Sequence, residues 1–219
     1  NLIEDYKYID GVHFGERKHW LQDDYVKFIR LGQFLVDKNG EGILAYINNH
    51  GFIDNPTFRA MRWHLLNSFD KIYIIDLHGN SKKKEVCPDG SKDENVFDIT
   101  TGVSINLFIK TGKEKREMLA RVYHADLWGT REKKYPDLDK GSLNKYKLDE
   151  VVCENPYYFF KPKNESGRID YDCGFRISDL LKSNTVGFVS GNDLLNISFT
   201  KEDSKNKIVD LLNLSESVW

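Results

Sequence analysis

A short polar segment follows the first strongly apolar run of the chain, and its side chains could bind a ligand. Residues 42–48 read Gly-Ile-Leu-Ala-Tyr-Ile-Asn, which is typical of a strand buried on both faces of a parallel sheet. Asn49 and His50 come directly after this run. Ligands of open α/β sheets bind beyond the carboxyl ends of parallel strands, and amide groups there can hydrogen-bond the polar edge of a nucleobase. The competing interpretation is that Asn49 and His50 cap the next helix or bind loop backbone.

Two further groups of side chains are typical of contacts with nucleic acids. Residues 82–84 are three consecutive lysines in a long polar loop, where they could bind phosphates or simply be solvated. Residues 157–160 read Tyr-Tyr-Phe-Phe, and the rings of Phe159 and Phe160 could stack on bases. An aromatic strand in the hydrophobic core is the alternative interpretation of this second group.

The cysteine and histidine positions form no metal-binding motif. Cys87, Cys153 and Cys173 are separated by 66 and 20 residues, so the sequence holds no Cys-x-x-Cys pair. His78 and Cys87 stand alone and do not have the spacing of a zinc site. We therefore expect no metal. A sparse and odd number of cysteines is also typical of reduced thiols, which predicts a cytoplasmic protein.

Composition and charge limit the classes of protein that remain. Of 219 residues, 40% are apolar and 13% aromatic, which is enough for a packed core and excludes a disordered chain. Because 32 basic and 34 acidic side chains leave a net charge of −2, any basic surface for DNA must be local. No apolar run is long enough to span a bilayer, so we expect no membrane partner. The chain starts at Asn1 without a methionine or signal peptide, which predicts a piece of a longer polypeptide.

The apolar periodicity predicts an α/β layer over residues 1–150. Apolar residues three and four apart predict the first helix, which Asn39-Gly40 would end. The third strand follows the second too closely for a crossover helix, so we expect it to be antiparallel. The expected elements are a helix over 22–37, a strand over 42–48, a helix over 56–69, a strand over 71–77 and a reversed strand over 102–110.

A smaller α+β segment is expected over residues 151–219, after a soft boundary near residue 150. Its expected elements are short strands at 151–152 and 157–160, a helical turn at 177–181 and a helix over 201–213.

Seven segments of the chain together resemble one protein family. They cover residues 23–30, 46–50, 54–62, 76–80, 88–97, 123–131 and 184–189, and include Asp76-Leu77-His78-Gly79-Asn80 and Tyr123-His124-Ala125-Asp126-Leu127-Trp128-Gly129-Thr130-Arg131. They resemble the adenine-specific DNA methyltransferase region of large single-chain restriction–modification enzymes. The type ISP enzymes, with a nuclease and a helicase-like ATPase upstream, are the most similar. The resemblance spans about residues 20–200.

The resemblance implies a fold and a reaction. The strands at 42–48, 71–77 and 102–110 would be the fifth, sixth and seventh of a Rossmann-like sheet whose last strand is reversed, and residues after about 150 would lead into the target-recognition domain. The implied reaction transfers a methyl group from S-adenosylmethionine to adenine N6 in DNA, with the target base flipped out of the stack. The family's Phe-x-Gly-x-Gly cofactor loop and catalytic Asn/Asp-Pro-Pro-Tyr are absent here. We expect both upstream, so this chain should hold no catalytic residue and should be inactive alone.

The resemblance also implies roles for individual residues. Phe160, and then Phe159, match the late aromatic that stacks on the flipped base, while Asn49 and His50 would lie at the pocket mouth. The expected partners are double-stranded DNA and the upstream nuclease, helicase-like and methyltransferase segments of the same parent chain. The alternative function is a non-catalytic DNA- or subunit-binding module derived from such an enzyme. Candidate phosphate contacts are Arg59, Lys82, Lys83, Lys84 and Arg131.

Overall fold

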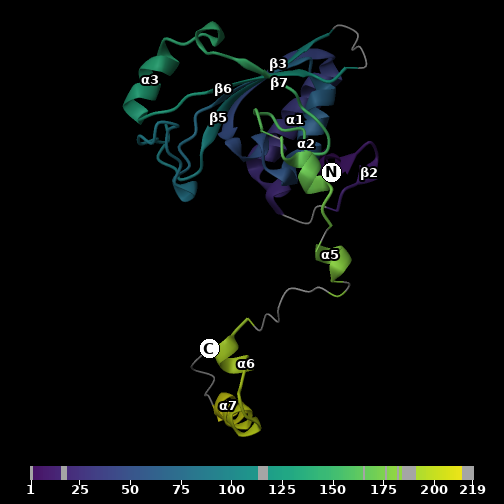
Figure 1. Cartoon of the computed structure of the whole chain (residues 1–219), viewed down its shortest axis with the longest axis vertical. Helices are drawn as coiled ribbons and strands as arrows, with labels where there is room; N and C mark the ends of the chain where they lie inside the picture. The colour runs from purple at the N-terminus through teal and green to yellow at the C-terminus, as the bar shows by residue number, and fades with distance from the viewer. Residues whose placement is uncertain are drawn as a thin grey trace. The chain divides into compact units, whose positions relative to one another are not determined.

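The chain divides into two compact units, residues 1–164 and 165–219 (Figure 1). The computed structural model describes residues 2–15, 19–112, 118–164, 166–175, 177–181, 183 and 191–213. The first unit therefore includes residues 151–164, beyond the soft boundary expected near residue 150. None of the helices in the described residues is long and apolar enough to cross a membrane.

The first unit is built on a five-stranded sheet of mixed direction. β5 is antiparallel to both of its neighbours, so β3 and β4 run in the same direction on either side of it. β6 is parallel to β4, and β7 is antiparallel to β6. This arrangement confirms an α/β fold with two parallel strands and a reversed third strand. In spatial order the strands are β3 (Glu41–Asn49), β5 (Val103–Thr111), β4 (Lys71–Asp76), β6 (Arg121–Asp126) and β7 (Asp149–Val151).

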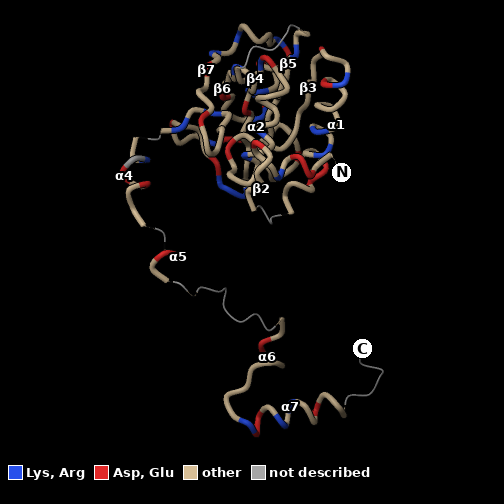
Figure 2. The backbone as a smooth tube through the Cα atoms, turned by 90° about the vertical axis from the view of Figure 1, so that its right-hand side faces the viewer, with Lys and Arg blue, Asp and Glu red and all other residues tan. Residues whose placement is uncertain are grey.

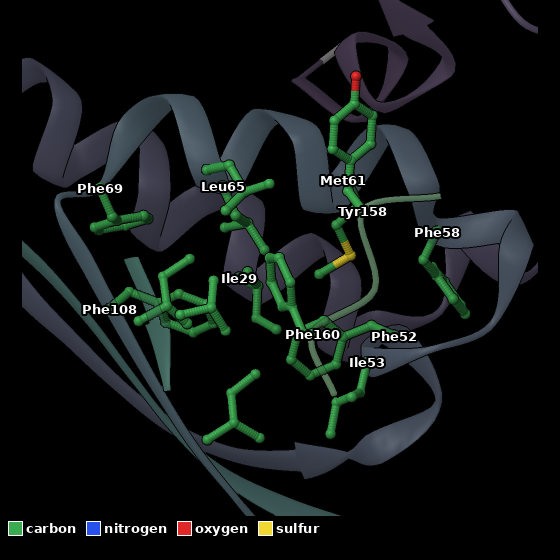
Figure 3. Packing of buried hydrophobic residues seen from close by; sticks show 14 of the residues in the cluster. Ile29, Phe52, Ile53, Phe58, Met61, Leu65, Phe69, Phe108, Tyr158 and Phe160 are labelled. Atoms are coloured by element: carbon green, nitrogen blue, oxygen red, sulfur yellow. The ribbon is translucent and has the colours of Figure 1, made fainter. Parts of the chain in front are cut away.

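Helices cover the two faces of this sheet. Apolar side chains of α1 (Asp24–Asn39) and α2 (Arg59–Ser68) form the main core with the sheet face that carries Ile72 and Ile74 (Figure 3). On the opposite face Ile75 packs in a smaller cluster that includes Leu138 of α3 (Arg131–Asp139). Alternate residues of β4 thus serve opposite layers, as the pleat of a strand requires.

The first helix ends as the sequence predicts. The residue after α1 is Gly40, which adopts the left-handed conformation with φ of 87°, and its N–H donates to the carbonyl groups of Val36 and Asp37. Glycine is favoured here because a side chain would be strained at positive φ. The helix expected over 56–69 forms as a 3₁₀ turn, η4 (Pro56–Phe58), followed directly by α2.

The prediction that the first strand is buried on both faces was wrong. β3 pairs with β5 only, among the described residues, and it forms an edge of the sheet. Ile43 and Ile47 are 66% and 50% exposed, and Phe28 and Leu35 of the neighbouring α1 are 56% and 55% exposed. An apolar run reads the same in an edge strand as in a central strand, because it does not report whether a neighbour is present.

β6 and α3 lie in a stretch for which the sequence predicted no element, and β7 begins in that stretch and ends at Val151. The short strand expected at 157–160 is absent, since a turn over residues 155–157 leads into irregular backbone in which Tyr158 has φ of 51°. The strand expected at 151–152 overlaps β7 only at Val151.

The expected helical turn at 177–181 and helix at 201–213 are present in the second unit, where none of the described residues is buried. Residues 184–189, the last of the family-like segments, lie outside the described residues. Basic and acidic residues both occur in each of the two units (Figure 2). The elements not yet given bounds are η1 (Leu2–Lys7), β1 (Tyr8–Ile9), β2 (Val12–His13), η2 (His19–Gln22), η3 (His50–Ile53), η5 (Ser81–Lys83), η6 (Leu143–Lys145), α4 (Arg168–Asp172), α5 (Ile177–Leu180), α6 (Asp193–Asn196) and α7 (Lys201–Asn213).

Candidate functional site

Polar side chains gather at the end of the sheet where three strands terminate. β3, β4 and β6 run in the same direction, so their carboxyl ends lie at the same end of the sheet. His50 follows β3, Asp76 ends β4 with His78 two residues later, and Asp126 ends β6. The side chains of His50, Asp76 and His78 are almost completely buried. Buried ionisable groups that meet in this way are candidates for a functional site.

Each of the two imidazoles is oriented by a carboxylate. His50 Nδ1 lies 2.8 Å from Asp76 Oδ1, and His78 Nε2 lies 2.7 Å from Asp126 Oδ1. The ring of His78 also stacks on Trp128, with ring centroids 3.3 Å apart and planes 11° apart. These contacts fix the rotation of both rings.

Glu85 completes this group from the long loop after β4. Its Oε2 accepts a hydrogen bond of 2.8 Å from the backbone N–H of Asn80, and its Oε1 lies 3.9 Å from His78 Nδ1. That nitrogen also lies 3.7 Å from Asp76 Oδ2, but it has no hydrogen-bond partner among the described residues. We refer to His50, Asp76, His78, Glu85 and Asp126 as the imidazole cluster.

The carboxylates set the ionisation of the cluster. Burial alone would lower the pKa of His78, but the carboxylates of Asp126, Glu85 and Asp76 outweigh it and raise the pKa to about 9. Burial alone would raise the pKa of Asp76, but its hydrogen bond to His50 and the charges of the two imidazoles hold the pKa below its ordinary value. The cluster therefore favours a positive charge between its acids.

A second buried group of charges lies nearby and has all its partners. The side chains of Lys134 and Asp93 are completely buried and form an ion pair of 2.6 Å. Lys134 Nζ also donates to the carbonyl groups of Leu77, at 2.7 Å, and of Glu94, at 2.6 Å. Asp93 accepts hydrogen bonds from the backbone N–H groups of Gly79 and Gly129. This group, the Asp93–Lys134 cluster, holds the loop after β4 against the end of that strand.

Four of the nine site residues predicted from the sequence line one cavity of about 280 Å³, namely Asn49, His50, Lys82 and Lys83. The two lysines belong to η5 and are exposed. Asn49 also caps η3, since its Oδ1 accepts a hydrogen bond of 2.7 Å from the N–H of Gly51. The capping interpretation of Asn49 is therefore correct, and its side-chain NH₂ group still has donors to offer.

The other basic residues predicted to bind phosphates do not line this cavity. Arg59 donates to the carbonyl groups of Pro56 and Phe14. Arg131 donates to the carbonyl groups of Asn95 and Phe97, and it lines a separate cavity of about 680 Å³. Lys84 is exposed at the end of η5. The structure therefore gives both arginines partners within the protein.

The two candidate stacking residues differ in burial. Phe160 is completely buried, and its ring packs edge-on against Phe52 at a centroid distance of 6.2 Å (Figure 3). Phe159 is half-buried and stacks on Tyr157 at 5.2 Å, with Lys163 Nζ 5.2 Å from its ring centroid. The core interpretation therefore describes Phe160 as it lies here, and base stacking remains a prediction for both rings.

Sequence reasoning missed most of the imidazole cluster. His78 looked isolated because its partners Asp76, Glu85 and Asp126 come from different elements, up to 48 residues away. The available signal was positional, because His50, His78 and Asp126 all lie at or just after the ends of strands. Using that signal required the strand order, and β6 was not predicted.

The comparisons with known proteins give similar folds. Neither a protein-family model nor a curated protein matches the sequence. The ATP-dependent Type ISP restriction-modification enzyme LlaBIII bound to DNA is 23% identical, with a TM-score of 0.70 over 95% of this chain and 14% of that chain. A nuclease-deletion mutant of the Type ISP enzyme LlaGI, in complex with a DNA substrate mimic, is 19% identical, with a TM-score of 0.65 over 95% of this chain and 19% of that chain. The DrdV–DNA complex is 19% identical, with a TM-score of 0.61 over 90% of this chain and 20% of that chain.

These similarities show a shared fold. Nearly the whole of this chain takes part in each match, but it spans only a fifth or less of the length of those solved chains.

Proposed function

We propose that this chain is the back half of the methyltransferase domain of a DNA N6-adenine methyltransferase from a restriction–modification system. The observation that carries the proposal is the spatial strand order β3-β5-β4, in which a reversed strand separates two parallel ones. The family resemblance implies two strands in one direction, the fifth and sixth, and a reversed seventh strand. The fold shared with DNA-bound Type ISP enzymes supports the same assignment.

The exposed edge of the sheet supports an upstream partner segment. β3 leaves its outer edge unpaired among the described residues, and Ile43, Ile47, Phe28 and Leu35 are about half exposed or more beside it. Unpaired edges next to apolar side chains are sites where another strand is added. We propose that the front half of the methyltransferase sheet covers this surface and supplies the S-adenosylmethionine loop and the catalytic motif.

The cavity beside β3 is the proposed entry for the flipped adenine. Asn49 lies at its wall with amide donors that can hydrogen-bond a base edge, and Lys82 and Lys83 line it and can bind the flanking phosphates. Phe159 is the proposed stacking residue because it is only partly buried, while Phe160 supports it from the core. Lys84, Arg59 and Arg131 are proposed as weaker phosphate contacts.

The proposal is tested by measuring transfer of a labelled methyl group from S-adenosylmethionine to DNA and mapping the modified base. The natural polypeptide that contains this chain should methylate adenine at N6. The chain alone should be inactive, and adding the separately expressed upstream segment should restore activity. Methylation by the chain alone would contradict the proposal. An inactive natural polypeptide without the two missing motifs would instead favour the non-catalytic module, which the exposed edge also supports.

The stacking assignment has its own test in the natural polypeptide. Because stacking on a base contributes about 1–3 kcal/mol, Phe159→Ala should lower methylation at limiting DNA by about 5- to 150-fold. Phe97→Ala is the matched control, since Phe97 is 46% exposed and does not line the cavity beside β3. Equal activity of the two variants would remove Phe159 from the base pocket.

A further inference from the structure

The imidazole cluster contains a buried nitrogen without a partner. His78 is 2% exposed, and its Nδ1 has no hydrogen-bond partner among the described residues. It nevertheless lies 3.7 Å from Asp76 Oδ2 and 3.9 Å from Glu85 Oε1. A buried polar atom left unbonded is unfavourable, so this nitrogen requires an explanation.

The hydrogen bonds of the cluster indicate which ring nitrogens carry lone pairs. His50 can donate its Nδ1–H to Asp76, and His78 can donate its Nε2–H to Asp126. This tautomer leaves a lone pair on His50 Nε2, which accepts a long contact of 3.5 Å from the Asn80 amide, and another on His78 Nδ1. Histidines that bind metals show this pattern, in which one ring nitrogen donates to a carboxylate and the other binds the ion.

The third donor is held in place by the backbone. The N–H of Asn80 fixes one oxygen of Glu85, and the other oxygen lies near His78 Nδ1. His50, His78 and Glu85 each offer one ligand atom, and these atoms all lie within 4.8 Å of one another. We propose that His50, His78 and Glu85 bind one divalent transition-metal ion of the zinc class.

The choice of metal follows from the donors. Two imidazole nitrogens and one carboxylate suit zinc and its neighbours, whereas magnesium and calcium prefer oxygen ligands only. Three protein donors leave a fourth position for water or a bound group. The ion would join the end of β3, the end of β4 and the loop that carries Glu85. This replaces the expectation from sequence spacing that the chain binds no metal.

The surrounding charges also favour a cation. Asp76 and Glu85 both approach His78 Nδ1, so a lone pair there would face two carboxylates unless a positive charge lies between them. A proton on His78 Nδ1 would satisfy the same requirement, and the experiment below separates a metal ion from a proton. The inference does not depend on the methyltransferase proposal, because the test uses neither DNA nor methyl transfer.

The test measures metal binding by the chain after treatment with a chelator. We expect titration with Zn²⁺ to reach one ion per chain, and Co²⁺ to give the visible absorption bands of a tetrahedral complex. Glu85→Gln should weaken binding by more than about 100-fold, because it removes a ligand. Asp126→Asn should weaken it by about 10- to 100-fold, because Asp126 only orients His78.

Glu150→Gln is the matched control for Glu85→Gln. Glu150 lies on β7, and its carboxylate pairs with Arg121 at the surface, so its removal should leave metal binding unchanged. Circular dichroism on each variant would show that the fold is kept. The proposal is overturned if wild-type protein binds no Zn²⁺ beyond the level of Glu85→Gln. It is equally overturned if NMR shows that His78 stays doubly protonated in the presence of excess Zn²⁺, since a proton alone then fills the cluster.

Discussion

The Asp93–Lys134 cluster and the imidazole cluster lie at the same end of the sheet, yet they differ in how completely their groups are paired. Lys134 uses its ammonium group on Asp93 and two carbonyl groups, and both carboxylate oxygens of Asp93 accept hydrogen bonds. In the imidazole cluster, His78 Nδ1 lies among acids without a hydrogen bond. A closed set of partners indicates a structural role, while an open set indicates room for a ligand.

Breaking the Asp93–Lys134 cluster should give the largest loss of stability. Lys134→Met leaves the Asp93 carboxylate buried without its cation, which is expected to lower the free energy of unfolding by about 3–5 kcal/mol. Denaturant unfolding of the purified chain measures this loss. Lys133→Met is the matched control, because Lys133 is the exposed neighbour on α3, and it should change stability by less than about 0.5 kcal/mol. Similar values for the two variants would show that the Asp93–Lys134 cluster is not a structural anchor.

A substitution at Gly79, which follows His78 and binds Asp93, should lower stability by nearly as much. Gly79 has φ of +81° and donates to Asp93, and an added Cβ would meet Asn95 Cα at 2.3 Å. Gly79→Ala should therefore lose about 1–2 kcal/mol from backbone strain and a further 1–3 kcal/mol or so from overpacking. Gly90 has the same φ with nothing near its Cβ position, so Gly90→Ala should show the strain alone. Equal losses in thermal unfolding of the two variants would contradict the close approach to Asn95.

Asp54 forms a more exposed set of ion pairs with Lys161 and Lys163, which gives a reference for the stability that such pairs contribute. Burial alone would raise the pKa of Asp54, but Lys161 and Lys163 outweigh it and lower the pKa from 3.8 to about 2. The carboxylate thus stabilises the fold above pH 3.8, and this contribution is lost as pH falls toward 2. Asp54→Asn should cost about 2 kcal/mol at pH 7, and its difference from wild type should shrink on acidification.

The control for this pair is Asp24→Asn, which removes an exposed contact with Lys27. It should change the free energy of unfolding by less than about 0.5 kcal/mol at any pH. A loss for Asp54→Asn that does not depend on pH would rule out the ion pair as its cause.

A substitution in the imidazole cluster should give the smallest change in the free energy of unfolding when no metal is bound. Glu85 is half-buried and makes one backbone hydrogen bond, which the amide oxygen of glutamine can also accept. Glu85→Gln should therefore change the free energy of unfolding by less than about 1 kcal/mol in chelator. Added Zn²⁺ should raise the thermal midpoint of wild type and leave that of Glu85→Gln unchanged. A large loss in chelator would place Glu85 with the closed cluster instead.

Much of the α/β layer could be predicted from the sequence, because its signals are local. The spacing of apolar residues and Gly40 located α1, and the lack of a crossover helix before residue 102 predicted the reversed strand β5. α3 escaped prediction because its buried face presents Lys134, which a hydrophobic pattern does not count. β6 was missed because it lies in a charge-rich stretch. The charged Arg121 comes directly before Val122 and Tyr123, so the apolar run is short.

The candidate site was predictable only in part. Local patterns identified four residues that line one cavity. Asn49 and His50 directly follow an apolar run, and Lys82 and Lys83 belong to a run of three lysines. His78, Asp76 and Asp126 meet only because β4 and β6 are parallel neighbours, and sequence spacing does not specify which strands are adjacent. The degree of burial also separates Phe159 from Phe160, although the two are adjacent in the chain.

The most direct test of the difference between the two clusters is a zinc-edge anomalous difference map from crystals of the chain grown with Zn²⁺. We expect one strong peak bonded to His50, His78 and Glu85, and none beside Asp93 and Lys134. A map without a peak among those three ligands, in crystals that otherwise show this fold, would contradict this expectation.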